Sequence, residues 1–429
     1  MKRVLGLLTV TALLVSQTMF APDEVYAGET DFGPLEEVSG DADISGAPEM
    51  DLTESAPGAD ADTEHFTGTD DVAKAHDATL SEDGAGFADE DDAADSELTA
   101  DGEIDMMDPS NGEYYTIKYK DNKDGTCTVT GYTGSPAGTL VIPDAIKDLT
   151  VTAIAASAFK NSTFKGILKF PAGVERIGND AFRGCVGFTG VEFPGKLKEI
   201  GDRAFSGCVG LKKLTLCDSL VTIGEEAFYG CTAIRGDLTV PAGVYIKFKA
   251  FENCGFDGKL TFAEGFGRMG GYAFANTKFK GTITIPDSMS RISEYAFYGC
   301  KKITKLILGN NVTAVYQSAF DECTGLTGTI VIPDGVTFID KYAFWGCKGV
   351  EGFTLSENLS TISEGAFYGC NGIRDLVLPK NLSKCGKEAF KGAFGVAKIV
   401  NRSSVKLNAG DFIEDDSYFV KEGTNKPIK

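Results

Sequence analysis

Residues 201–223 read GDRAFSGCVGLKKLTLCDSLVTI, and versions of this segment recur along most of the chain. Eleven Ala-Phe pairs, one in each version, follow one another at steps of 23 residues, except for one step of 24. Their phenylalanines are Phe159, Phe182, Phe205, Phe228, Phe251, Phe274, Phe297, Phe320, Phe344, Phe367 and Phe390. Such a period is typical of one structural unit stacked on copies of itself, so the sequence predicts a repeat solenoid with a long surface.

Each repeat contains one clear strand pattern. In the quoted segment, Leu214, Thr215 and Leu216 alternate apolar and polar side chains, which predicts a short strand. A residue of buried type stands four positions before each alanine, as Ile223 does before Ala227. From there through the Ala-Phe pair we expect a tight turn or a short helical piece. The predicted fold is a β-rich solenoid of about eleven 23-residue coils.

The start of the chain has the pattern of a secretory signal peptide. In residues 1–27, Lys2 and Arg3 precede an apolar run, and small residues follow near Ala27. An uncleaved membrane anchor is the alternative, but the apolar run is short for a span of about 20 residues. We therefore expect secretion, with no stable membrane insertion after cleavage.

Residues 28–110 are strongly acidic. Residues 28–109 hold 27 Asp or Glu and a single basic residue, Lys74, which predicts a disordered stalk. Loose capture of calcium or of a cationic partner is the alternative role. Without this segment the chain has 40 basic and 35 acidic residues, hence a net charge of +5. Because no run of like charge occurs there, nucleic-acid binding is not expected.

The remaining chain divides into an N-terminal cap (residues 111–150), the solenoid (151–396) and a C-terminal cap (397–429). End caps are expected because the terminal coils of a solenoid would otherwise expose apolar surface and unpaired strand edges.

Eight of the eleven cysteines stand three residues after a repeat phenylalanine. They are Cys185, Cys208, Cys231, Cys254, Cys300, Cys323, Cys347 and Cys370. One cysteine per coil makes a row of parallel side chains, whereas disulfides and tetrahedral zinc sites need converging ones. Buried free thiols are therefore predicted; disulfides between neighbouring coils and a metal site are the alternatives.

The repeat pattern A-F-x-x-C-x-x-[LI]-x-x-[LI]-x-[LIV]-P closely resembles the BspA-type leucine-rich repeat. Residues 331–333 (VIP) and 343–347 (AFWGC) show it well. The resemblance implies a curved leucine-rich-repeat solenoid on a secreted or surface-displayed protein. Family members are linked to adhesion to host matrix proteins, host cells or other microbes. The resemblance implies neither an enzyme nor a cofactor.

Catalytic chemistry finds little support in the composition. The only histidines, His65 and His76, lie in the acidic segment, so the repeats cannot hold a Ser-His-Asp, Cys-His or histidine-based zinc site. Residues 265–270 (GFGRMG) match a nucleotide-binding loop by letter, but they lie inside a repeat. A chance pair of carboxylates keeps a glycan hydrolase as a remote alternative. No catalytic residue, cofactor or metal is predicted.

Two surface rows are candidates for ligand binding. The middle strand position carries Thr215, Thr239, Thr261, Thr284 and Thr354. The position after the repeat phenylalanine carries Tyr229, Tyr298, Trp345 and Tyr368. Strand propensity alone would explain the threonines, and packing over adjacent turns would explain the aromatics.

The predicted function is that of an adhesin which binds an extracellular protein or glycan through the solenoid face. The main alternative is a structural component of the cell envelope or matrix that self-associates.

Overall fold

The computed structural model describes residues 101–135, 137–393, 398–406, 418–421 and 427–428. They belong to one compact unit, Ala85–Lys429, and consist of strands and turns without a helix. None of these residues therefore forms a helix long and apolar enough to cross a membrane. The predicted signal peptide, most of the predicted stalk and both histidines lie outside the described residues.

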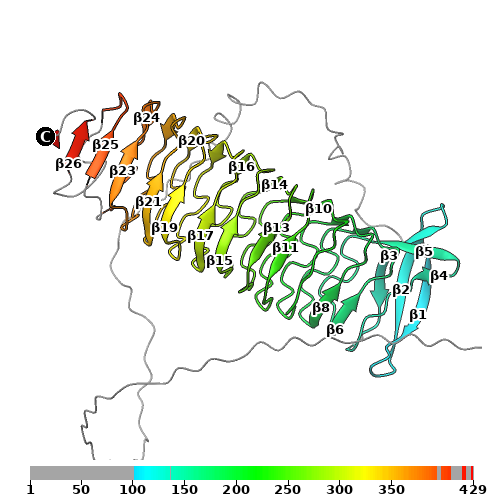
Figure 1. Ribbon diagram of the computed structural model, residues 1–429. Coiled ribbons are helices and arrows are strands. Elements are labelled where there is room, and N and C mark those ends of the chain that lie inside the picture. The colour runs from blue at the N-terminus through cyan, green and yellow to red at the C-terminus, as the bar shows by residue number, and fades with distance from the viewer. Residues whose placement is uncertain (1–100, 136, 394–397, 407–417, 422–426, 429) are drawn as a thin grey trace, which may run out of the picture. The chain divides into compact units, whose positions relative to one another are not determined.

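The first sheet starts with antiparallel strands and continues as parallel strands from successive coils (Figure 1). Its order is β1-β2-β3-β5-β7-β9-β10-β12-β14, with β4 paired to β5. The bounds are β1 Gly102–Met107, β2 Tyr114–Asp121, β3 Thr126–Thr133, β4 Ala145–Ile146, β5 Leu149–Ile154, β7 Arg176–Ile177, β9 Glu199–Ile200, β10 Thr222–Ile223, β12 Tyr245–Ile246 and β14 Arg268–Met269. β1 lies within the residues predicted as the disordered stalk, so ordered structure begins earlier than the sequence indicated.

The later coils repeat the same two-residue strand in a second parallel sheet, ordered β16-β18-β20-β22-β24. Its bounds are β16 Arg291–Ile292, β18 Ala314–Val315, β20 Phe338–Ile339, β22 Thr361–Ile362 and β24 Lys384–Cys385. The coil of β14 also bonds to the next one, because the Ser293 hydroxyl donates to the Met269 carbonyl at 2.6 Å. The coils therefore stack continuously across the boundary between the two sheets.

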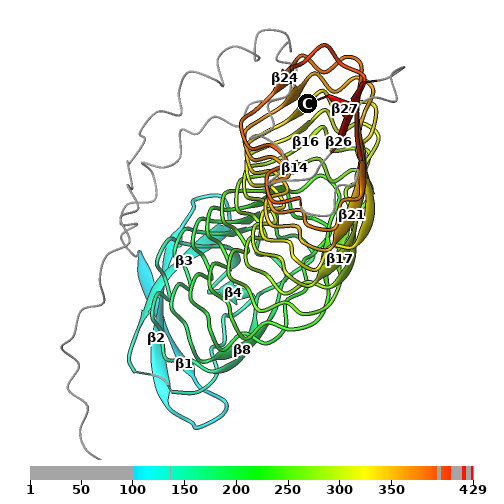
Figure 2. The same ribbon diagram turned by 90° about the vertical axis from the view of Figure 1, so that its left-hand side faces the viewer.

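A different side of the coils carries a second series of strands (Figure 2). They form the pairs β6-β8, β11-β13, β15-β17 and β19-β21 and the sheet β23-β25-β26-β27. The bounds are β6 Gly166–Lys169, β8 Phe188–Glu192, β11 Leu238–Val240, β13 Leu260–Phe262, β15 Gly281–Thr284, β17 Ile303–Ile307, β19 Gly328–Val331, β21 Val350–Thr354, β23 Asp375–Leu378, β25 Lys398–Asn401, β26 Tyr418–Lys421 and β27 Pro427–Ile428.

One predicted strand is absent. Leu214 and Leu216 are buried and Thr215 is exposed, as the alternation predicted, but residues 214–216 form no strand. The only bridge in residues 209–220 joins Lys213 to Gly190. Side-chain alternation follows from the path of the chain within one coil, whereas a strand also needs a ladder of backbone hydrogen bonds to a neighbouring coil.

The repeat phenylalanines form a continuous stack through the core, as predicted. The ring of Phe228 is fully buried, and its centroid lies 5.3 Å from that of Phe205 and 5.2 Å from that of Phe251. The rings of Phe228 and Phe251 are almost parallel, with an angle of 2° between their planes. Each coil therefore covers the apolar surface of the coil before it.

The Ala-Phe segments are tight turns, which confirms the first of the two predicted forms and not the short helical piece. In the coil of Ala227 and Phe228, Glu226 directly before the pair has a φ of 52°, and Gly230, two residues after Phe228, has a φ of 70°. These left-handed residues interrupt any helix. The backbone N–H of Phe228 donates to the carbonyl of Ala250 in the next coil, at 2.8 Å. Bonds to the next coil thus alternate with bonds inside the turn, such as the one from the Tyr229 N–H to the Glu226 carbonyl at 3.0 Å.

Candidate functional site

The predicted threonine row lies on the outer surface of the second series of strands. Thr215, Thr239, Thr261, Thr284 and Thr354 are all exposed. Ile307, Val331 and Val377 occupy the same position in other coils and are 42%, 58% and 38% exposed. The structure therefore places an exposed face of β-branched side chains across the coils.

Strand pairing brings members of this row side by side. Thr239 pairs with Thr261 between β11 and β13, and Val331 pairs with Thr354 between β19 and β21. Because side chains of paired residues lie next to each other, the row presents neighbouring hydroxyl and methyl groups to a partner. We call this surface, which contains Thr215, Thr239, Thr261, Thr284, Ile307, Val331, Thr354 and Val377, the strand face.

The aromatic row is not continuous. Tyr229, Tyr298, Trp345 and Tyr368 are all half-buried. Trp345 and Tyr368 are in contact, with ring centroids 6.0 Å apart and an angle of 22° between the planes. Tyr229 stands alone, because the equivalent residues of the neighbouring coils are Ser206 and Glu252. The structure thus assembles one aromatic pair from the four predicted residues.

Beside that aromatic pair lies an open hollow of about 250 Å³. Its lining consists of Glu322, Trp345, Gly346, Lys348, Tyr368, Gly369, Asn371 and Gly392. The carboxylate of Glu322 lies 3.5 Å from the Lys301 ammonium group. Oriented to satisfy its neighbours, the amide nitrogen of Asn371 donates to the carbonyl oxygens of Gly369, at 2.9 Å, and Gly392. The aromatic rings of Trp345 and Tyr368 and the polar side chains of Glu322, Lys348 and Asn371 therefore line the same hollow.

Sequence reasoning missed a second aromatic cluster. The rings of Tyr272 and Tyr295 stack at 4.3 Å, and the exposed Phe248 ring lies 5.7 Å from that of Tyr272. The Lys249 ammonium group lies 5.4 Å from the Tyr272 ring centroid. Burial, together with the hydroxyl of Tyr295, raises the pKa of Tyr272 to about 12. The available signal was a tyrosine directly before the alanine of two successive Ala-Phe pairs.

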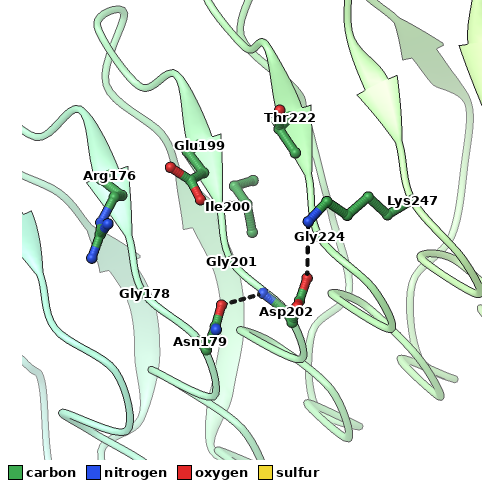
Figure 3. A pocket seen from close by; sticks show the side chains of 10 residues that line it. All are labelled: Arg176, Gly178, Asn179, Glu199, Ile200, Gly201, Asp202, Thr222, Gly224 and Lys247. Carbon is green, nitrogen blue, oxygen red and sulfur yellow. Dashed lines mark hydrogen bonds and ion pairs between the residues drawn. The ribbon is translucent and has the colours of Figure 1, made fainter. Parts of the chain in front are cut away.

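A smaller hollow of about 70 Å³ lies over β7, β9 and β10 (Figure 3). The carboxylate of Asp202 lies 3.9 Å from the Lys247 ammonium group. The backbone N–H of Asp202 donates to the side-chain oxygen of Asn179 at 2.7 Å. Gly178 lines the floor because a Cβ there would lie 2.6 Å from the backbone nitrogen of Ala156. This hollow results from close packing of coils and has room for water rather than for a ligand.

The cysteines are free thiols, as predicted. All eleven are unpaired, and the eight of the repeat row are buried. The alternative of disulfides between neighbouring coils is therefore wrong. Burial raises the pKa of Cys300 to about 11, which makes its thiolate form rare near neutral pH. Within the described residues no group of three or more Cys, His, Asp or Glu side chains is arranged to hold a metal ion.

The chain is similar to several solved structures of bacterial proteins. A leucine-rich repeat protein from Bacteroides ovatus shares 23% identity, over 71% of this chain and 98% of that protein, with a TM-score of 0.39. A leucine rich cell surface protein from Faecalibacterium prausnitzii shares 22% identity, over 78% and 97%, with a TM-score of 0.46. The pneumococcal vaccine antigen PcpA shares 17% identity, over 76% and 90%, with a TM-score of 0.44.

Because these TM-scores are all below 0.5, the likenesses carry no argument about this protein. No curated protein matches the chain. The family model for the BspA type leucine rich repeat region matches residues 152–280 and 267–397, with six copies, and these ranges cover more than half of the chain. The residues that they cover carry the stacked phenylalanines, the thiol row and the strand face. The protein therefore belongs to the BspA-type leucine-rich repeat family.

Proposed function

We propose that this protein is a secreted or surface-displayed adhesin, which binds host matrix protein, host cells or other microbial surfaces through the strand face. The observation that carries this proposal is the exposure of Ile307, Val331 and Val377 at 42%, 58% and 38% beside the exposed threonines. Contact of these apolar side chains with water is unfavourable. Their burial against a partner would remove that contact and so favour binding.

The small size of the hollows supports a macromolecular partner. The two hollows described above have volumes of about 70 and 250 Å³, whereas pockets for small molecules have volumes of about 300–1,000 Å³. A macromolecule can instead contact several coils at once, and a specific interface buries about 800 Å² on each partner. The repeated strand face offers a surface that such a partner can cover.

Binding of the full chain to an array of matrix proteins and glycans, at low and high salt, tests this proposal. Val331→Glu places a charge on the strand face, whereas Val221→Glu places one at a valine of similar exposure outside it (58% and 54%). We expect saturable binding that Val331→Glu weakens and Val221→Glu leaves unchanged. Absence of binding to every array ligand, together with self-association in size-exclusion chromatography, would contradict adhesion and support the structural alternative.

A further inference from the structure

One edge of the solenoid is strongly basic. It lies where each of five successive coils passes from its Cys or Thr position towards the strand face, in residues 209–307. We call it the basic edge; its members are Lys212, Lys213, Arg235, Lys259, Lys278, Lys280, Lys301, Lys302 and Lys305. All nine side chains are exposed.

Bonds between coils show that these residues are neighbours in space. The backbone N–H of Arg235 donates to the carbonyl of Lys212 at 3.0 Å. The N–H of Lys280 donates to the carbonyl of Gly258 at 2.8 Å, which places Lys280 beside Lys259, the residue directly before β13. In the pairing of β15 with β17, Thr282 lies opposite Lys305. At about 4.8 Å between strands, five coils extend this edge over roughly 20 Å.

Few acidic groups neutralise the basic edge. Its segments contain two, Asp237 and Asp257, and both accept backbone hydrogen bonds, from Lys259 at 2.7 Å and from Gly236 at 2.8 Å. Asp257 also lies 4.0 Å from Arg235. Nine basic and two acidic residues leave a net charge of +7 on this edge.

Most of these lysines have no ionic partner. Lys301 pairs with Glu322 at 3.5 Å. The other seven make no ion pair within the ranges that the structure describes; they are Lys212, Lys213, Lys259, Lys278, Lys280, Lys302 and Lys305. Like charges held this close repel one another, and an anionic partner would relieve that repulsion.

We infer that the basic edge binds a linear anionic polysaccharide, one that carries sulfate or carboxylate groups at regular intervals. This inference rests on the proposed adhesion and names the ligand class. The edge runs across five successive coils over roughly 20 Å, so a single extended chain can follow it from coil to coil. Lys213 and Lys259 stand two residues before Thr215 and Thr261, on the strand face, so sugar hydroxyls would meet threonine hydroxyls beside the lysines.

The charge of the whole chain makes this inference specific. The formal net charge is −21, so the protein as a whole should repel a polyanion. Attraction must therefore come from a local surface, and the described coils of residues 209–307 supply one. Polyanion binding that depends on these lysines would not be expected from the overall composition.

The test measures binding of the full chain to immobilised heparin, polygalacturonate, uncharged dextran and duplex DNA. The edge variant combines Lys212→Gln, Lys259→Gln, Lys280→Gln and Lys302→Gln. The control variant combines Lys196→Gln, Lys380→Gln, Lys384→Gln and Lys387→Gln, which are exposed positions outside the edge with the same loss of charge. We expect the edge variant to bind heparin at least about tenfold more weakly and the control to change less than about twofold, with salt weakening the wild-type complex.

Four results would overturn the inference. They are equal affinity of both variants for heparin, wild-type retention on dextran as strong as on heparin, equally tight binding of duplex DNA, and no binding of either heparin or polygalacturonate. In the last case, saturable binding of another array ligand that Val331→Glu weakens would leave the proposed adhesion standing. Absence of binding to every array ligand would contradict both proposals.

Discussion

The sulfur of Cys254 lies 3.0 Å from the carbonyl oxygen of Phe228, in the preceding coil. Cys231, in the same coil as Phe228, donates its backbone N–H to that oxygen at 3.1 Å. The carbonyl oxygen of Phe228 thus accepts one hydrogen bond from its own coil and one from the next coil. This relationship joins the two most regular features of the sequence, the phenylalanine stack and the cysteine row. The short distance between sulfur and carbonyl oxygen explains why a small residue occupies the cysteine position, since a larger side chain would push the coils apart.

Thiol reactivity should separate the cysteine row from the two half-buried cysteines, Cys217 and Cys385. Burial keeps reagents away from the row and raises the pKa of thiols such as Cys300 and Cys323, which lowers the reactive thiolate fraction. We expect Cys217 and Cys385 to be alkylated first in the native protein. All eleven thiols should react in denaturant without a reductant. Peptide mass spectrometry measures both, and fewer than eleven thiols in denaturant would reveal disulfides.

Removal of one stacked ring should be costly. Phe228→Ala leaves a cavity between the rings of Phe205 and Phe251, so we expect a loss of about 3–5 kcal/mol in the free energy of unfolding. Denaturant unfolding followed by circular dichroism measures it. The exposed Val331→Ala is the matched control and should change stability by less than about 0.5 kcal/mol. A loss below about 1 kcal/mol for Phe228→Ala would contradict the role of the stack.

The aromatic pair should contribute to ligand binding if the ligand of the strand face also covers the hollow beside Trp345. Trp345→Ala removes the ring that stacks on Tyr368, and we expect at least about tenfold weaker binding of the ligand found on the array. Tyr229→Ala is the control, because Tyr229 stands apart from the other aromatics of its row, and it should bind normally. Surface plasmon resonance compares the variants. Unchanged affinity of Trp345→Ala would place the contact elsewhere on the solenoid.

Asp321 should make stability depend on pH. Burial raises its pKa from 3.8 to about 6, and its Oδ1 has no hydrogen-bond partner among the described residues. The folded protein therefore binds this proton more tightly than the unfolded chain does. Its contribution to stability falls as pH rises from about 4 to about 6 and stays low above that. Asp321→Asn should thus raise the melting temperature near pH 7.5, and this gain should shrink towards pH 4.

Thermal melting of both proteins across this pH range checks the expectation. Glu351→Gln, a change of the same charge at an exposed residue, is the control and should show no such pH dependence. An equal effect of Asp321→Asn at both ends of the range would mean that burial does not shift this carboxyl group.

The repeat period predicted the core well, because every coil uses the same positions for the same purpose. The stack around Phe228 and the burial of Cys254 both follow from their places in the repeat. The period did not predict backbone pairing. Residues 214–216 show the strand pattern without a strand, since pairing depends on the neighbouring coils as well. The contact of Tyr272 with Tyr295 was also missed, although both precede an Ala-Phe pair.

By itself the sequence determined the solenoid, its period and the residues inside each coil. Those features depend on side-chain types that recur every 23 residues, and such a pattern is visible in one dimension. Only the tertiary structure decided which surface residues act together. No run of basic residues occurs in the repeats, yet coiling brings residues some 23 positions apart to about the spacing of paired strands. Lys212, Arg235 and Lys259 thereby become parts of one basic edge, because Coulomb forces depend on distance in space and not on separation along the chain.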